Sequence, residues 1–425
     1  MRRLITAVLF LSAAAVGGET IALVGGTIHP VSGTDISKGT VVITDGKIAE
    51  VGANVVPPAG AKVVDVSGKH VYPSLVPAAT NLGLVEIGAV RATVDQAETG
   101  DVNPEARADV AMNFDSEQLP VTRSAGVLVA GVTPQGGIVS GSGAAMKLDG
   151  WTREDATILA PAYVTVTWPD LSIDRSPRAR FTVRIQQKRR DEAVAKLKDV
   201  FAEARAYGKA RAAEGKAGVP RHDLDPRLEA LLPAIEGKVP VFVFADRLAQ
   251  IRAALAWAKD ENLKIVIAGG RDAWRAASEL AAAGVPVVLD PVIGLPTRTD
   301  EPYDVPYAAP GILSKAGVRV AITEGDSSFV RNLAHYASVA MAYGMPREKA
   351  VEAITLEPAR ILGIADRVGS LEPGKDATLF VADRDVLDFR YGVVAAYVDG
   401  RPLDLSDRHK RLYERYRNRP KREIK

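Results

Sequence analysis

Residues 239–270 read VPVFVFADRLAQIRAALAWAKDENLKIVIAGG and carry the main signal for the fold. The segment begins and ends with short apolar runs, Val239 to Phe244 and Lys264 to Ile267, which are rich in β-branched residues. The residues between them, Ala245 to Asp260, have the composition and spacing of a helix. Near-continuous apolar strands that alternate with helices are typical of a parallel sheet buried on both faces. This segment therefore predicts one strand–helix–strand unit of such a sheet.

The same alternation extends from about residue 125 to residue 365. Further strand-like runs are Val127 to Ala130, Val285 to Leu289 and Val318 to Ile322, and further helical stretches are Arg227 to Ile235, Asp272 to Ala283 and Pro310 to Ala316. A longer charged helix is expected over residues 182–217, with Val194, Leu197, Val200 and Phe201 as its apolar stripe. Eight strand–helix units that close on themselves form a (β/α)8 TIM-type barrel, and the pattern fits a barrel better than an open sheet. We predict an α/β fold in which residues 73–367 form this barrel.

Both ends of the chain carry short β segments instead of helices. The segment Thr40 to Thr44 ends at Asp45-Gly46, which is a strong hairpin signal. After Gly369 the chain returns to strand-like runs, from Ala377 to Ala382 and from Val393 to Val398. We expect residues 19–72 and 368–403 to build one small β-sandwich domain beside the barrel.

Residues 1–18 resemble a secretory signal peptide. Arg2 and Arg3 precede an apolar run from Leu4 to Val16, which ends in small residues. That run is too short for a stable membrane anchor, and no later run reaches the roughly 18 apolar residues that a membrane-spanning helix needs. We expect an exported protein, periplasmic or secreted, without stable membrane insertion.

The C-terminal tail, residues 404–425, is basic. Residues 406–425 hold nine Lys or Arg and three Asp or Glu, whereas the chain as a whole has a net charge of +2. A basic tail can contact nucleic acid or an anionic membrane. Because the tail is short and the body is not basic, we favour a solvated helix whose Leu412, Tyr413 and Tyr416 pack on the body, and we expect no nucleic-acid partner.

Composition excludes several classes of site. The chain has 425 residues, more than one hydrophobic core supports, so a large domain with a smaller companion is expected. It has no Cys, which excludes disulfides, thiolate-bound zinc and a cysteine nucleophile. The five histidines, His29, His70, His222, His335 and His409, are widely separated, and we expect none of them to converge on a shared site.

Two flanking segments resemble a known family. GGTIHPVSG and GTVVITDGKIAEVG near the N-terminus, and AVEAITLEPARILGIADRVGSLEPGKDATLFVAD near the C-terminus, are similar to the imidazolonepropionase-related branch of the amidohydrolase superfamily. The resemblance implies a (β/α)8 barrel with a β-sandwich. It also implies hydrolysis of a carbon–nitrogen or related bond by metal-activated water, with zinc or another divalent metal held at the carboxyl ends of the strands.

The positions that carry metal-binding histidines in that family are occupied by other residues here. The His-x-His pair corresponds to Ala79-Thr80-Asn81, and two later histidines correspond to Phe244 and Gly269. The family's aspartate falls on Gly325 or Asp326. Alanine, phenylalanine and glycine side chains do not bind metal, and an amide is a poor ligand for zinc. We therefore predict no metal ligands and no cofactor.

Polar residues near the expected strand ends are the candidate site residues. Asp326, Glu324 and Asp246 follow strand-like runs and are candidates for general acid and base catalysis. Residues 84–124 form a long connection, which we expect to cover the barrel mouth as a lid. Asn81 and residues of this connection are predicted to bind a ligand in the pocket; they are Glu86, Arg91, Asp95 and Arg123.

Two functions from different classes remain open. The first is a hydrolase of non-peptide carbon–nitrogen bonds that works without metal and whose hydrolytic activity is weak or lost. The second is an exported, non-catalytic module that binds a small molecule or a protein on a degenerate barrel. In both cases an unidentified small molecule occupies the barrel mouth, and self-association is left open.

Overall fold

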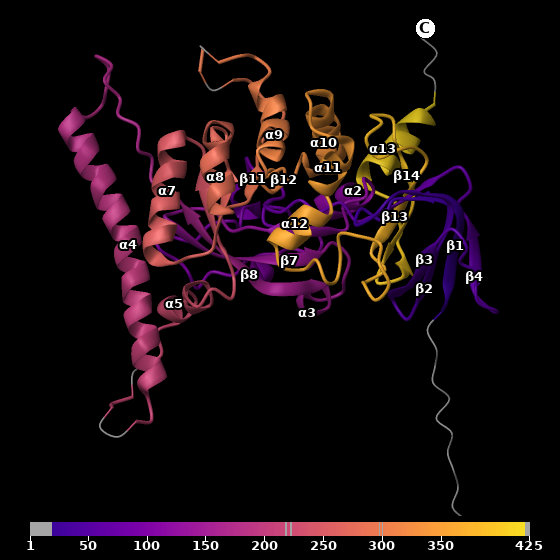
Figure 1. Ribbon diagram of the computed structural model, residues 1–425, viewed down its shortest axis with the longest axis horizontal. Helices are drawn as coiled ribbons and strands as arrows, with labels where there is room; N and C mark the ends of the chain where they lie inside the picture. The colour runs from indigo at the N-terminus through magenta and orange to yellow at the C-terminus, as the bar shows by residue number, and fades with distance from the viewer. Residues whose placement is uncertain (1–18, 217–218, 222, 297, 300, 421–425) are drawn as a thin grey trace, which may run out of the picture.

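The structure is a computed structural model, and it describes residues 19–216, 219–221, 223–296, 298–299 and 301–420. The expected signal peptide, residues 1–18, and His222 lie outside the described residues. The chain forms two sheets, which lie side by side in Figure 1. The smaller domain, at the right of the view, joins the two ends of the described chain, and the larger αβ domain lies beside it.

The first sheet combines strands from both flanks of the chain. Its order is β15-β14-β13-β5-β1-β2-β3, and β4 pairs with β1. The strands are β1 (Ile21–Ile28), β2 (Ile36–Thr44), β3 (Lys47–Gly52), β4 (Lys62–Asp65), β5 (His70–Pro73), β13 (Leu379–Ala382), β14 (Val393–Val398) and β15 (Arg401–Pro402). The alternating apolar side chains of these strands, among them Leu23, Val41 and Leu379, form a separate core. We call this part the β domain.

The second sheet has seven strands in the order β12-β11-β10-β9-β8-β7-β6. They are β6 (Val129–Val132), β7 (Val139–Lys147), β8 (Thr157–Thr167), β9 (Val241–Ala245), β10 (Ile265–Gly269), β11 (Val287–Leu289) and β12 (Val320–Ile322). The strands β8 to β12 pair in parallel, whereas β7 is antiparallel to both of its neighbours. The prediction of eight equivalent strand–helix units is therefore wrong in the first half of this domain.

The two edges of this sheet are linked by residues 75–81. Leu75 and Thr80 form parallel bridges with residues of the β6 edge. On the other side, the backbone N–H of Ala79 donates to Thr323 Oγ1 over 3.1 Å, and that of Asn81 donates to the carbonyl of Gly325 over 3.0 Å. The sheet is thus strongly curved, and this segment lies between its two ends.

Most helices pack on the outside of the second sheet, mainly along its parallel half, and α7 to α11 stand in a row in Figure 1. They are α1 (Ala108–Ala111), α2 (Gln118–Arg123), α3 (Arg153–Ala156), α4 (Val183–Ala213), α5 (Pro226–Glu229), α6 (Leu232–Ile235), α7 (Leu248–Glu261), α8 (Ala277–Ala283), α9 (Val305–Lys315), α10 (Leu333–Ala342), α11 (Arg347–Glu352), α12 (Leu356–Ile361) and α13 (Arg408–Arg417), with 3-10 turns at Arg91–Thr93, Ala273–Ala276 and Val330–Asn332. Within the described residues, no helix is long and apolar enough to span a membrane.

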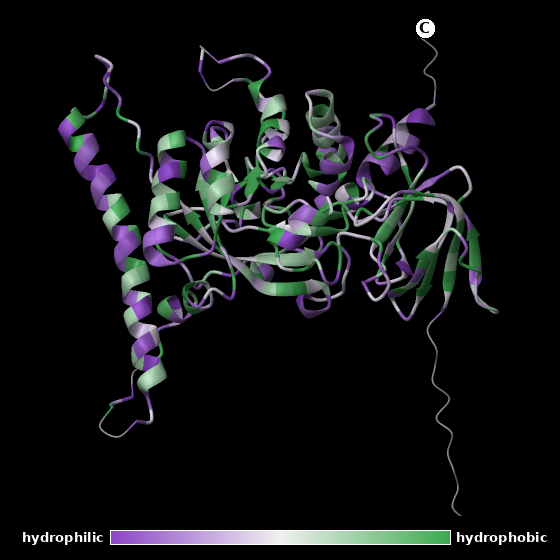
Figure 2. Ribbon diagram, in the orientation of Figure 1, coloured by the Kyte–Doolittle hydropathy of each residue, from purple (hydrophilic) through white to green (hydrophobic). Residues whose placement is uncertain are grey.

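The long helix α4 extends beyond the body at the left of Figure 1, and hydrophilic and hydrophobic residues alternate along it in Figure 2. Only Leu197, Phe201 and Ala204 are buried, so a short apolar stripe attaches it. At the other end of the chain, α13 has no buried residue. Tyr413 and Tyr416 are 61% and 60% exposed, so the expectation that they pack on the body is wrong. Helix α13 instead contacts the body through an ion pair between Arg411 and Glu117.

Candidate active site

The carboxyl ends of the parallel strands bring acidic side chains together at one edge of the sheet. Asp246 directly follows β9, Asp290 follows β11, and Glu324 lies two residues after β12. The registers Gly269↔Ala245, Gly269↔Leu289 and Leu289↔Ile322 place these strand ends next to one another. In a parallel sheet, residues that follow neighbouring strands meet at the same edge, which is where ligands bind in α/β folds.

Two glycines give Asp246 and Asp290 the space that they occupy. A Cβ atom on Gly269 would lie 2.5 Å from Asp246 Oδ1, and Gly269 also has a φ of +80°. A Cβ atom on Gly325 would lie 2.6 Å from Asp290 Oδ2, and the backbone N–H of Gly325 donates to the same oxygen over 3.2 Å. Larger residues at either position would displace the carboxylate, so the two glycines belong to the architecture of this site.

The position of Asp290 changes its protonation. Burial raises the pKa of Asp290 to about 7, and the negative charges of Glu324 and Asp246 act in the same direction, whereas the hydrogen bond from Gly325 lowers it. Burial also raises the pKa of Asp246, against the opposing effect of Arg271, although its side chain remains half-exposed. Asp290 therefore exists in both protonated and ionised forms near neutral pH, which suits proton transfer.

Glu324 is held in place by two hydrogen bonds. The hydroxyl of Tyr336 donates to Glu324 Oε2 over 2.7 Å, and the backbone N–H of Asp326 donates to Oε1 over 3.0 Å. Glu324 is 8% exposed. Burial, followed by the hydrogen bond and the charge of Glu324, raises the pKa of Tyr336, so this hydroxyl remains a proton donor. The predicted candidate Asp326 is exposed, and it accepts from the N–H of Ser328 over 2.9 Å.

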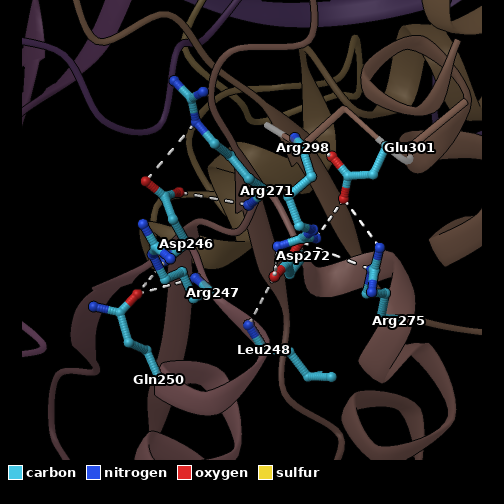
Figure 3. Close-up of polar contacts among 9 residues, drawn as sticks. All are labelled: Asp246, Arg247, Leu248, Gln250, Arg271, Asp272, Arg275, Arg298 and Glu301. Carbon is cyan, nitrogen blue, oxygen red and sulfur yellow. Dashed lines mark hydrogen bonds and ion pairs between the residues drawn. The ribbon is translucent and has the colours of Figure 1, made fainter. Parts of the chain in front are cut away.

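A second polar cluster, centred on Asp272, lies beside Asp246 (Figure 3). Asp272 accepts hydrogen bonds from Arg298 and from the backbone N–H of Leu248. Glu301 pairs with Arg298 and with Arg275. Burial alone would raise the pKa of Asp272, but the hydrogen bonds from Arg298 and Leu248 outweigh it and lower the pKa. The lowered pKa favours the ionised form of Asp272, which anchors the chain segment that contains Arg298.

Arg271 connects the two clusters. In Figure 3 its side chain extends toward Asp246, with 3.9 Å between Arg271 Nε and Asp246 Oδ2. Arg271 also lines a small pocket with a cavity volume of about 30 Å³, which is formed by the ends of β10 and β11 together with α9 and the segment that leads to it. Glu301 is the other charged lining residue, and apolar residues such as Leu289 and Pro291 form most of the wall. Asp290 lies between two of these lining residues in the sequence, but its carboxylate faces Gly325 and does not itself line the pocket.

The interior of the curved sheet is filled with apolar side chains. Tyr163 stacks on Phe242 with ring centroids 3.9 Å apart. Gly143 leaves room for the tyrosine ring, since a Cβ atom there would lie 2.1 Å from it. Ala79 is 5% exposed and belongs to this cluster, and Phe244 packs against it. Any ligand must therefore bind at the strand ends rather than deeper in the sheet.

The predicted pocket residues do not gather in one place. Asn81 lies at the strand ends, where its Oδ1 accepts from Ser327 over 2.8 Å and its Nδ2 donates to Gln96 over 3.0 Å. The other four predicted pocket residues contact residues of the connection 84–124 or of segments next to it. Glu86 accepts from Ser116 and Glu117, Arg91 donates to Val94, Asp95 is exposed and donates its N–H to Leu84, and Arg123 pairs with Asp149.

Sequence reasoning missed Asp290, Arg271, Asp272, Arg298 and Glu301. The signal for Asp290 was the same as that for Asp246, because each aspartate directly follows an apolar strand-like run. Arg271 and Asp272 follow Gly269-Gly270 at the next strand end. Arg298 and Glu301 could not be found in this way. They lie in the segment between β11 and α9, and their proximity to the strand ends depends on the three-dimensional fold.

One group of residues that could hold a metal lies outside this edge of the sheet. Among the residues that the structure describes, this group consists of His29, His70 and Asp385. Their candidate ligand atoms all lie within 4.8 Å of one another. The expectation that no histidines converge is therefore wrong for His29 and His70. The expectation of no metal ligands is not confirmed either.

Comparisons with known proteins identify the lineage. Residues 304–403 match the model of the amidohydrolase family. An imidazolonepropionase from Brucella suis is 30% identical over 145 residues, which are 34% of this chain and 35% of that protein. The chain thus aligns with about a third of the length of the curated relatives that it matches. An amidohydrolase from Thermotoga maritima superposes with a TM-score of 0.80 at 27% identity, over 90% of this chain and 99% of that one.

These findings support the amidohydrolase superfamily as the lineage of this chain. The resemblance found in the sequence is thus confirmed at this level. An adenosine deaminase from Xanthomonas campestris with bound zinc shares the fold, with a TM-score of 0.55 at 16% identity over 94% of this chain and 97% of that one.

The donor set at the strand ends differs from the imidazole-rich set that the superfamily resemblance implies. Ala79, Phe244 and Gly269 offer no ligand atom, and both oxygen and nitrogen of the Asn81 amide are hydrogen-bonded within the protein. Asp246, Asp290 and Glu324 offer oxygen only. Zinc prefers imidazole nitrogen or a mixture of imidazole and carboxylate, so these residues do not fit the superfamily metal.

Proposed function

We propose that this chain is a hydrolase of carbon–nitrogen bonds in small molecules and that carboxyl groups, rather than a divalent metal, move the protons at its active site. Superfamily membership and the activity named for the Brucella suis relative support the reaction class. The observation that carries the proposal is Asp290, whose pKa of about 7 places both of its protonation states at neutral pH, at the same edge of the sheet as Asp246 and Glu324.

The proposed reaction needs one proton acceptor and one proton donor. Water attacks the carbonyl carbon of the C–N bond while the ionised Asp246 accepts a proton from that water. The protonated Asp290 then donates its proton to the leaving nitrogen as the C–N bond breaks. Arg271 lies beside Asp246 and at the pocket wall, where its charge favours a substrate that bears a carboxylate. General acid–base catalysis of this kind contributes about 10²- to 10⁴-fold, so a slow enzyme is expected.

Turnover of a defined set of compounds tests this function. Imidazolonepropionate, the substrate implied by the name of the Brucella relatives, and a series of cyclic amides and N-acyl amino acids should be incubated with the protein and assayed for ring opening or amine release. We expect slow turnover that EDTA does not abolish and that Asp290→Asn lowers about 100-fold. The exposed Asp326→Asn serves as the matched control. Turnover that EDTA abolishes, or that Asp290→Asn leaves unchanged, refutes the carboxyl mechanism.

A second candidate function is binding without turnover. The filled interior formed by Tyr163 and Phe242 favours it, because a ligand at this end of the sheet would have to bind in the small pocket at the strand ends. Tight binding of a carboxylate-bearing compound, lost in Arg271→Gln and without any product, would support this function over hydrolysis. For either function we propose that the protein works outside the cytoplasm, because Leu4 to Val16 has the composition of a signal peptide.

A further inference from the structure

A compact cluster of His and Asp lies in the β domain, where the chain faces α11. His29 follows β1 and His70 begins β5, and these two strands pair in parallel with Thr27 opposite His70. The pairing places His29 Nε2 2.9 Å from His70 Nδ1. His29 is 3% exposed, and its ring stacks on Tyr72 with 4.1 Å between the ring centroids. The two imidazoles are thus fixed in position by the sheet and by the tyrosine.

Two carboxylates complete the cluster. Asp35 Oδ2 lies 2.8 Å from the other nitrogen of His29, Nδ1. Asp385, in the loop after β13, has a ligand oxygen within 4.8 Å of both imidazoles, and its Oδ1 accepts from the N–H of Leu387 over 2.8 Å. Arg347 of α11 binds Asp385, and its guanidinium lies 3.5 Å from Asp35. Two negative charges therefore face a single positive charge, which leaves the site favourable for a further cation.

We propose that His29, His70 and Asp385 bind one divalent transition-metal ion, such as Zn²⁺ or Ni²⁺. Zinc–nitrogen distances are about 2.0–2.1 Å, so an ion at that distance from both imidazole nitrogens, which are 2.9 Å apart, has an N–metal–N angle of about 90°. That angle suits octahedral Ni²⁺ and a distorted tetrahedral Zn²⁺. Asp35 provides the outer carboxylate that orients metal-bound histidines in many proteins, because it faces the nitrogen of His29 that points away from the ion.

The ion competes with interactions that are already present. Metal binding replaces the hydrogen bond between the two imidazoles, and it shares Asp385 with Arg347. Because of these costs we expect a dissociation constant in the micromolar range rather than the much tighter binding of a structural zinc site. The three ligands come from the residue after β1, from the start of β5 and from the loop after β13, so the bound ion links the two chain segments that build the β domain.

The experiment uses the full chain after EDTA treatment and dialysis, titrated with ZnCl₂ and separately with NiCl₂ in a calorimeter. We expect one ion per chain. His70→Gln should weaken binding at least tenfold, whereas the exposed His409→Gln and the active-site variant Asp290→Asn should bind as the native chain does. Circular dichroism of the metal-free His70→Gln protein checks that it is folded. No binding at millimolar metal, or equal binding by His70→Gln and the native chain, overturns the proposal.

A second variant tests Asp385 in the opposite direction. Arg347→Gln removes the cation that competes for this carboxylate, so the metal should bind more tightly, by about tenfold. Unchanged or weaker binding contradicts Asp385 as a ligand. The metal site does not depend on the proposed hydrolase function: loss of binding in His70→Gln without loss of turnover separates the two proposals.

Discussion

Replacing Asp290 by Asn should alter the pH dependence of the stability of the αβ domain. Asn has nearly the same shape and can still accept the hydrogen bond from the backbone of Gly325, but it does not titrate. In the native chain, burial and the charges of Glu324 and Asp246 favour the protonated form of Asp290. The variant therefore removes one titration from the folded state and changes little else.

The size of the effect follows from the two pKa values of Asp290. Its ordinary pKa is 3.8 and its pKa in the folded chain is about 7. A difference of about three pH units corresponds to about 4 kcal/mol as an upper limit, and we expect about 2 kcal/mol because the neighbouring carboxyl groups titrate together with Asp290. Between pH 4 and 7 the folded state binds more protons than the unfolded state. The native free energy of unfolding therefore falls as the pH rises through this window.

Tryptophan fluorescence reports this change selectively, because Trp151, Trp168, Trp257 and Trp274 all belong to the αβ domain. Urea unfolding should be measured at intervals from pH 4.5 to pH 8 for the native chain, for Asp290→Asn and for the exposed control Asp326→Asn. We expect the free energy of unfolding of Asp290→Asn, relative to the native chain, to rise by about 2 kcal/mol between the two ends of this range. The control should follow the native chain. Parallel curves for Asp290→Asn and the native chain would show that Asp290 has an ordinary pKa.

Three further predictions concern other parts of the molecule. Gly269→Ala should lower the free energy of unfolding by about 2–4 kcal/mol, because it adds a collision with Asp246 to the strain of a positive φ; Gly60→Ala, with a φ of +83° and open space around it, should cost only about 1 kcal/mol, and equal losses would contradict the close approach of Asp246. Arg298→Gln should speed amide hydrogen exchange about tenfold in residues 291–296 and 301–305, because it loosens the contacts with Asp272 and Glu301, whereas Arg390→Gln, which breaks a surface pair with Asp388, should leave those residues unchanged. Protein from the native host should begin near residue 19, and N-terminal sequencing that finds Met1 would exclude cleavage there.

The parallel half of the αβ domain could be predicted from the sequence because its strands are continuous apolar runs. The runs expected at residues 239–244, 264–267, 285–289 and 318–322 coincide closely with β9 to β12, and the helix expected at 182–217 contains α4. Burial on both faces imposes this composition, so local sequence is informative. The same reasoning fails for β7, because its sequence VSGSGAAMK is rich in small residues and lacks the β-branched apolar run of the parallel strands.

The small residues of β7 have a cause that is visible only in three dimensions. Gly143 faces the ring of Tyr163, and Gly141 approaches the backbone of Ala106, so side chains are excluded by residues distant in sequence. The six residues between β6 and β7 also leave no room for a crossover helix, and antiparallel pairing follows. A prediction that assumes a series of equivalent strand–helix units therefore cannot reveal that β7 is antiparallel to its neighbours.

The candidate site was predictable where it depends on strand ends and not elsewhere. Asp246 and Glu324 were found because they follow apolar runs, and Asp290 could have been found by the same criterion. In contrast, His29 and His70 meet through the parallel pairing of β1 with β5, across 41 residues of sequence. Local patterns carry no information on such a pairing, because it depends on register between distant strands.

The most direct test of the central claim is X-ray diffraction from crystals soaked in a zinc salt, measured across the zinc absorption edge. The claim is that the strand-end site works through carboxyl groups and holds no divalent metal. We expect an anomalous peak between His29, His70 and Asp385 and none among Asp246, Asp290 and Glu324. A strong peak among those three carboxylates, at ligand distances of about 2.0–2.2 Å, would contradict the account and restore metal-activated water as the nucleophile.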